Sequence, residues 1–153
     1  MTRRRVRTGL RAGRREAARH PHVVLVVDDD GDLRESVVRY LETMGVHAVG
    51  APGGPQALAL LRGGLPACLI ILDMRMPAMD GFAFREAQIG DPAIADIPVI
   101  LFSAEPVADG RAHRLGLDTQ ITKPVEPERI AELVDRHCAH PESASADEPD
   151  ADR

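Results

Sequence analysis

Three short apolar runs divide the middle of the chain, and a polar side chain follows each of them directly. The runs are VVLVV, CLIIL and IPVILF, at residues 23–27, 68–72 and 97–102. Their continuity and their β-branched residues predict strands that are buried on both faces of a parallel sheet. Two weaker strand candidates are HAVGA and TQIT, at residues 47–51 and 119–122.

A helical pattern follows each of these predicted strands. We expect the first helix to begin at its cap, Asp32, and to end at Gly45. The face that it turns to the core is expected to carry Leu33, Val37, Tyr40, Leu41 and Met44. The other four helices are predicted at residues 54–62, 80–89, 108–115 and 127–138. Five strands alternating with five helices predict an open, doubly wound α/β domain, with its site at the carboxyl ends of the strands.

The two ends of the chain differ from the middle in charge. Residues 1–20 hold eight arginines and one glutamate, and residues 141–153 hold five acids and one arginine. Blocks of like charge without apolar periodicity are typical of disordered extensions. We therefore expect a basic, disordered arm at residues 1–20, a folded domain at residues 21–140 and an acidic, disordered tail at residues 141–153. Two alternatives for the arm are a contact with nucleic acid or another anionic partner, and a natural start further along the chain.

Composition argues against several classes of protein. Apolar runs of about five residues are far shorter than the roughly 20 that a membrane span needs, and no apolar segment follows the charged start as in a signal peptide. Aromatic residues make up 3% of the chain, which leaves little for the stacking of nucleic-acid bases. Cys68 and Cys138 lack metal-ligand spacing, so we expect reduced thiols in or near the core of a cytoplasmic protein.

Polar side chains with a chemical use stand at the ends of four predicted strands. They are Asp28, Asp29 and Asp30 after the first, Asp73 after the third, Ser103 after the fourth and Lys123 after the fifth. Parallel strands end at one edge of a sheet, so we expect these side chains to meet. Clustered carboxylates suit a hard cation such as Mg²⁺. Lys123 is the only lysine beside eighteen arginines, which favours a position that needs a compact point charge.

Four segments, VVDDD, LDMRMPAMDG, LFSA and ITKP, in this order and at these intervals, resemble the receiver domains of two-component response regulators. The resemblance covers about residues 23–138 and suggests a bacterial, single-domain protein similar to the chemotaxis regulators. It implies a flavodoxin-like sheet with strand order 2-1-3-4-5. It also implies that a histidine kinase or a histidine phosphotransfer protein donates a phosphoryl group, and that the chain is no enzyme beyond gaining and losing that group on its own aspartate.

The resemblance assigns the acidic residues their roles. Asp73 would be the phosphoacceptor. Asp29 would bind Mg²⁺ directly and Asp28 through water, together with Asp73 and the main-chain carbonyl of Arg75; Mn²⁺ is the alternative ion. Asp30 is expected in the following loop as a solvent-facing acid.

The hydroxyl and the ammonium would bind the phosphoryl group. Ser103 would donate a hydrogen bond to one phosphoryl oxygen, and Lys123 would pair with another. Ala104 is small, as the approach to a crowded site requires. Pro124 is expected after a cis peptide that aims Lys123 inward.

Three positions near the site vary or depart from the family pattern. Many receivers have an aromatic residue three positions before the lysine, where this chain has Gln120. The usual coupling of the hydroxyl to a ring is therefore in doubt, and an output change would travel through the Ser103 loop or the helix after it. Arg75 and Glu105 are expected to approach each other across the pocket mouth and hinder an attacking water.

No second domain is visible after residue 138, so we expect the protein to act through contacts with an unidentified protein target. Homodimerisation through the fourth and fifth helices is a habit of the family. Two other functions stay open: an Asp-nucleophile phosphatase, although Arg75 stands where those enzymes need an acid, and a binding protein that uses its basic arm on nucleic acid. We expect neither a membrane nor a nucleic-acid partner.

Overall fold

A five-stranded parallel sheet forms the centre of the computed structural model, which describes residues 23–108 and 110–138. The strands are β1 (Val23–Val27), β2 (His47–Ala51), β3 (Ala67–Asp73), β4 (Val99–Ser103) and β5 (Gln120–Thr122). Their order is β2-β1-β3-β4-β5, and all four pairings are parallel. The predicted strand order is confirmed. The arm and the tail expected at the two ends lie outside the described residues.

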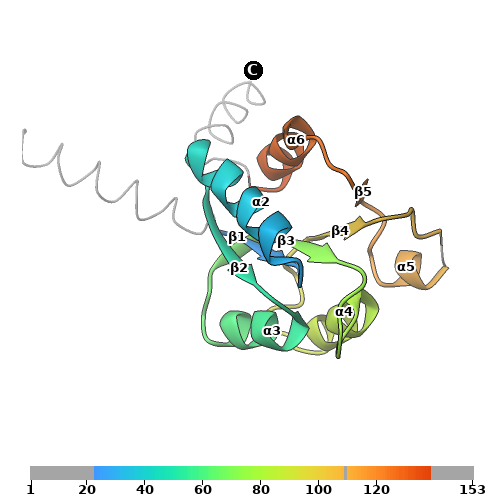
Figure 1. The fold of residues 1–153 in the computed structure, drawn as a ribbon. Helices are drawn as coiled ribbons and strands as arrows, with labels where there is room; N and C mark the ends of the chain where they lie inside the picture. Colours follow the sequence, from blue (N-terminus) through green and yellow to red (C-terminus); the bar gives the residue numbers. More distant parts are fainter. Residues whose placement is uncertain (1–22, 109, 139–153) are drawn as a thin grey trace, which may run out of the picture.

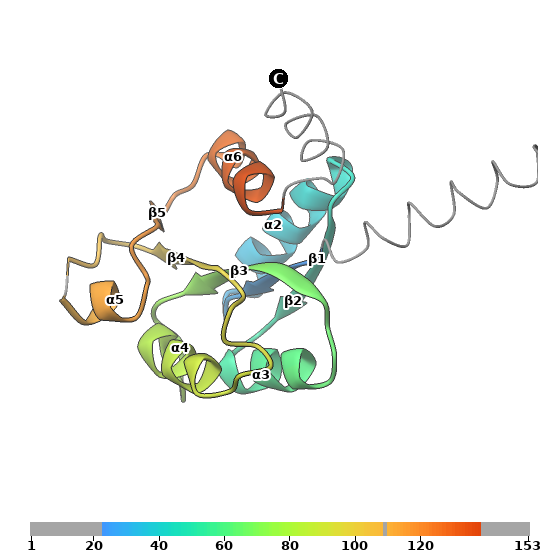
Figure 2. The ribbon, with the colours of Figure 1, turned by 180° about the vertical axis from the view of Figure 1, so that it is seen from behind.

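Helices cover both faces of this sheet (Figures 1 and 2). They are α2 (Gly31–Thr43), α3 (Gly54–Arg62), α4 (Gly81–Ile89), α5 (Gly110–Arg114) and α6 (Pro127–His137). Val24 and Val26 of β1 pack in one cluster with α2 and α6, whereas Leu25 and Val27 pack in another with α3 and α4. Alternate residues of a strand point to opposite faces, so one continuous apolar run supplies both cores. The predicted doubly wound α/β fold is confirmed.

The start of α2 differs from the prediction. Its cap is Asp30, whose carboxylate accepts a hydrogen bond from the main-chain N–H of Leu33 at 3.2 Å. Asp32, the expected cap, lies in the first turn because the helix begins two residues earlier than expected. The expected exposure of Asp30 to solvent is confirmed. Met44, expected on the buried face, is 38% exposed, since the helix ends one residue before it.

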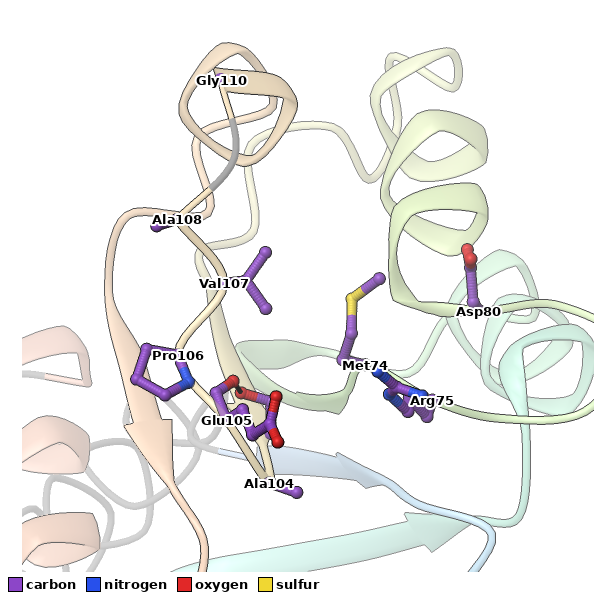
Figure 3. Close-up of a pocket in the computed structure, with 10 residues that line it drawn as sticks. Met74, Arg75, Asp80, Ala104, Glu105, Pro106, Val107, Ala108 and Gly110 are labelled. Atoms are coloured by element: carbon purple, nitrogen blue, oxygen red, sulfur yellow. Dashed lines mark hydrogen bonds between the residues drawn. The ribbon is translucent and has the colours of Figure 1, made fainter.

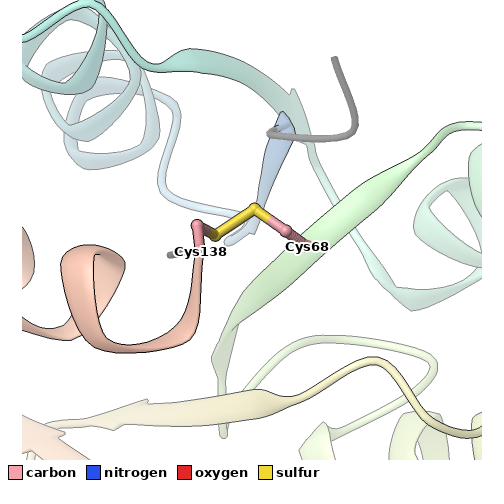
Figure 4. Close-up of a disulfide and its surroundings, with 2 residues drawn as sticks. All are labelled: Cys68 and Cys138. Atoms are coloured by element: carbon pink, nitrogen blue, oxygen red, sulfur yellow. A yellow bond between two sulfur atoms is a disulfide. The ribbon is translucent and has the colours of Figure 1, made fainter. Parts of the chain in front are cut away.

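The two cysteines form a disulfide between the beginning of β3 and the end of α6 (Figure 4). The expectation of reduced thiols is therefore wrong. The residues are 70 positions apart in sequence, and only the packing of α6 over the sheet brings their Cα atoms to 5.6 Å. Because disulfides are rare in reducing compartments, the cysteines no longer support the predicted cytoplasmic location. Within the described parts of the chain, no helix is long and apolar enough to cross a membrane.

Candidate functional site

The carboxyl ends of β1, β3 and β5 bring three charged side chains together. The Lys123 ammonium donates hydrogen bonds to Asp73 Oδ1 at 3.0 Å and to Asp28 Oδ2 at 3.3 Å. Both carboxylates are almost completely buried, whereas 24% of the lysine side chain is exposed. The cis peptide expected between Lys123 and Pro124 is present. The expected meeting of side chains at one edge of the sheet is thus confirmed for Asp28, Asp73 and Lys123.

Three hydrogen bonds hold the main chain and side chain of Asp28 in place. Its N–H donates to the carbonyl of Ala51 at 3.1 Å, and its Oδ1 accepts from the N–H of Asp30 at 2.9 Å. Its carbonyl accepts a hydrogen bond from the guanidinium of Arg34 at 2.7 Å. A Cβ at Gly50 would lie 3.0 Å from the Arg34 side chain, so the glycine gives Arg34 its path. The pair of Gly50 and Arg34 was not predicted, although a glycine inside a strand is a sequence signal of a close approach.

Three carboxylates lie close enough to share one cation. Asp28, Asp29 and Asp73 each offer an oxygen atom, and these atoms lie within 4.8 Å of one another. Asp29 is exposed, while the other two are buried. Carboxylate oxygens are the donors that Mg²⁺ prefers, and an exposed ligand gives a hydrated ion access. These residues fit a metal site.

Burial and charge both act on Asp73. Its burial raises the pKa of the Asp73 carboxyl, the hydrogen bond from Lys123 opposes this, and the negative charge of Asp28 adds to the rise. Burial alone would lower the pKa of Lys123, but the hydrogen bond to Asp73 and the charge of Asp28 outweigh it, so that pKa is raised. The site therefore holds a charged lysine and an excess of acid, which a divalent cation would neutralise.

A cavity of about 950 Å³ lies between the loop that directly follows Asp73 and the loop that follows β4 (Figure 3). One wall comes from the loop after β3 and includes Met74 and Arg75, and the other comes from residues 103–108. Ser103 is buried, and its hydroxyl donates to the main-chain carbonyl of Glu105 at 2.5 Å. The predicted donor to a phosphoryl group is thus engaged within its own loop. Ala104 is exposed beside it.

Arg75 and Glu105 lie on opposite sides of this cavity (Figure 3). Both are exposed, and across residues 23–108 and 110–138 no ion pair joins them. The expected approach of the two side chains across the mouth of the cavity therefore stays a prediction.

Residues 24–135 match the family described as the response regulator receiver domain. The chain belongs to this family. The receiver is 37% identical over 117 residues to an uncharacterized 14.6 kDa protein of Leptolyngbya boryana, a match that covers 75% of this chain and 88% of the relative. It is 31% identical to the response regulator Rre1 of Synechocystis sp., over 82% of this chain and 55% of the relative. It spans only 7% of the hybrid signal transduction protein dokA of Dictyostelium discoideum.

Solved structures of receivers have the same fold. The chemotaxis protein CheY4 of Vibrio cholerae superposes with a TM-score of 0.70 at 27% identity, covering 75% of this chain and 97% of that chain. A receiver protein from Pseudomonas putida gives a TM-score of 0.70 at 30% identity, covering 74% of this chain and 95% of that chain. Residues 24–135 thus form a two-component signalling receiver, a family that is not one of catalytic enzymes, and this argues against the phosphatase alternative.

Gly81 is a further residue of the site that was not predicted from the sequence. Its N–H donates to the carbonyl of Met74 at 2.8 Å. A Cβ at this position would lie 3.1 Å from Met74 Cα and 3.2 Å from the carbonyl oxygen of Asp73. The start of α4 therefore packs directly against the main chain that carries Asp73, and any side chain at this position would push that main chain away by a few tenths of an ångström. Its signal in the sequence was the Asp-Gly pair that closes LDMRMPAMDG.

Proposed function

We propose that this receiver accepts a phosphoryl group on Asp73 from a histidine kinase or a histidine phosphotransfer protein, and that it signals through phosphorylation-dependent contacts with another protein. The observation that supports this most directly is the placement of Asp73. Its carboxylate is buried at a strand end, bonded by Lys123 at 3.0 Å and within reach of two further carboxylates.

The proposed reaction transfers the phosphoryl group from nitrogen to oxygen. A carboxylate oxygen of Asp73 forms the new O–P bond as the P–N bond of the donor's phosphohistidine breaks, and the electron pair of that bond returns to the imidazole. The contact of Lys123 with Asp73 Oδ1 supports its proposed pairing with a phosphoryl oxygen. Mg²⁺, held by Asp28, Asp29, Asp73 and the carbonyl of Arg75, would supply further charge neutralisation and orientation.

Ser103 is proposed to change its hydrogen bond when the phosphoryl group arrives. Its hydroxyl now donates to the Glu105 carbonyl, and rotation would let it donate to a phosphoryl oxygen instead. A hydrogen bond to a charged acceptor is stronger than one to a neutral carbonyl, so the exchange is favourable once that charge is present.

The full chain should become labelled by acetyl phosphate in the presence of Mg²⁺ and remain unlabelled in EDTA. Asp29→Ala should raise the Mg²⁺ concentration needed for half-maximal labelling by at least roughly 10- to 100-fold, because the loss of even an outer-shell partner of a metal ligand costs that much affinity. Asp30→Ala is the matched control, because Asp30 is an adjacent exposed acid that caps α2. It should lose about 1 kcal/mol of stability and keep the Mg²⁺ dependence. Labelling that ignores EDTA would rule out the proposed metal site.

The lifetime of the acyl phosphate is proposed to depend on Arg75 and Glu105. Both line the cavity beside the loop that follows Asp73, and this cavity is the proposed path of an attacking water. Arg75→Ala and Glu105→Ala should each speed autodephosphorylation, by up to about tenfold, since that corresponds to roughly 1.4 kcal/mol of barrier. Phosphoryl loss followed over time after removal of the donor measures this. Equal lifetimes in both variants and the wild type would remove these residues from the mechanism.

A further inference from the structure

The side-chain amide of Gln120 binds the loop between β4 and α5 through both its oxygen and its nitrogen. Its Oε1 accepts a hydrogen bond from the main-chain N–H of Val107 at 2.9 Å, and its Nε2 donates to the carbonyl of the same residue at 2.8 Å. A third, longer contact runs from Nε2 to the carbonyl of Leu117 at 3.4 Å. Gln120 and Val107 are both partly buried. One side chain of β5 thus satisfies both main-chain groups of a residue in the cavity wall.

The end of the same loop that follows β4 is held by a single side-chain hydrogen bond. The hydroxyl of Ser103 makes one hydrogen bond to the carbonyl of Glu105, an exposed residue. If Ser103 rotates toward a phosphoryl group, water can replace it at this carbonyl at little cost. If Val107 moved away from Gln120, however, its N–H, its carbonyl and the amide of Gln120 would all lose partners in a partly buried place, which is the more expensive change. The hydrogen bond to Glu105 should therefore break more easily than the two hydrogen bonds between Val107 and Gln120.

We infer that Gln120 is a positioning residue that keeps Val107 attached to β5 both before and after phosphorylation. Movement that starts at Ser103 is then confined to residues 104–106, at the mouth of the cavity. Arg75 lies on the wall of the cavity that faces this segment (Figure 3). This inference rests on the proposed function, because it needs a phosphoryl group on Asp73.

A carboxamide suits this task better than a ring. Its planar acceptor and donor match the carbonyl and N–H of one residue at the same time. An aromatic side chain at this position would have no pair of groups with which to hold Val107. Glutamine in place of an aromatic residue at position 120 thus fixes the loop after β4 at Val107.

The test is amide hydrogen exchange at Val107, measured by NMR on the full chain with and without beryllofluoride and Mg²⁺, which mimic an acyl phosphate on an aspartate. In the wild type, the Val107 amide should exchange at least tenfold more slowly than in Gln120→Met, a variant of similar length without hydrogen-bonding groups. Beryllofluoride should shift the signals of Ala104 and Glu105 while leaving the exchange rate of Val107 unchanged within about twofold.

Variants separate positioning from a merely structural role. In Gln120→Met, beryllofluoride should change the exchange at Val107 as well, because the loop has lost its fixed point. Gln120→Glu keeps the acceptor for the Val107 N–H but sets a carboxylate against two carbonyls, so its protection should be intermediate. Thr119→Val, an isosteric change at the neighbouring residue, should behave like the wild type.

The failures of the two proposals can be told apart. Wild-type Val107 protection that is lost when beryllofluoride binds, or is no greater than in Gln120→Met, would overturn the inference and leave phosphoryl acceptance intact. The absence of any beryllofluoride-dependent change around Asp73 in every variant would overturn the proposed function and the inference with it.

Discussion

Asp73→Asn should reduce phosphoryl labelling by acetyl phosphate to below about 1% of the wild-type level. An amide has nearly the same shape as a carboxylate but lacks a nucleophilic oxygen, so the O–P bond cannot form. A loss of 100-fold corresponds to about 2.7 kcal/mol of barrier, which is far more than loosened packing of an isosteric side chain would cause.

The fold should survive this substitution. Burial and the nearby Asp28 raise the pKa of Asp73, so the folded state holds its proton more tightly than the unfolded chain does. Such a group disfavours folding at pH values above its unfolded pKa, and its stability contribution recovers as the pH falls. In the absence of Mg²⁺ at neutral pH, Asp73→Asn should therefore unfold at the same temperature as the wild type or higher.

Asp80→Asn is the matched control. Asp80 is an exposed residue of the same cavity that caps α4 through a hydrogen bond from the N–H of Ala83 at 2.8 Å, and asparagine caps helices equally well. This variant should label like the wild type. Wild-type labelling of Asp73→Asn, with a melting curve that shows a folded protein, would mean that another residue is the acceptor.

Loss of the disulfide should lower the free energy of unfolding by about 4 kcal/mol, the value that chain entropy gives for a closed loop of this length. The two cysteines are 70 residues apart. Since small domains have roughly 5–15 kcal/mol in total, the change is a large part of the whole. Urea unfolding of Cys138→Ser measures it against the wild type.

Reductant supplies the control for this measurement. It should move the unfolding midpoint of the wild type to that of Cys138→Ser and leave the variant unchanged. Cys68→Ser and the double variant should lose about the same free energy as Cys138→Ser, because each removes the same bond. A wild type whose midpoint ignores reductant would show that the disulfide contributes nothing to stability.

Local sequence patterns predicted the first half of the sheet well. The limits of β1, β2 and α3 agree with their expected residues, because an apolar run or a helical stripe ends there at a glycine, proline or aspartate. The beginning of β4 was predicted two residues early, at Ile97. The carbonyl of Ile97 accepts hydrogen bonds from Gln88 at 3.0 Å and from Arg85 at 3.3 Å, so it is bound to α4 side chains and not to the sheet. Such a long-range network leaves no periodic signal.

Some features of the site could be predicted from the sequence and others could not. That Asp28, Asp73 and Lys123 meet follows from the rule that parallel strands end at one edge, which needs only the limits of the strands. The direction of the Ser103 hydroxyl does not follow, because it depends on the fold of the loop after β4. α5 begins at Gly110, not at the predicted residue 108, and the preceding Val107 is bound to Gln120. These details are set by partners that are distant in sequence.

The disulfide also sorts the residues of the site into those inside and those outside the loop of chain that it closes. Cys68 and Cys138 close a circle of chain that contains Asp73, Ser103 and Lys123, whereas Asp28 and Asp29 lie outside it. At the site the two groups meet where β1 lies beside β3, with Val27 opposite Leu72, and where Lys123 donates a hydrogen bond to Asp28. A chain whose circle has folded but whose first strand is still undocked would hold the acceptor without two of its three acids. Mg²⁺-dependent phosphorylation of Asp73 would therefore begin only after β1 has docked in the sheet, and it can be used to detect that step of folding.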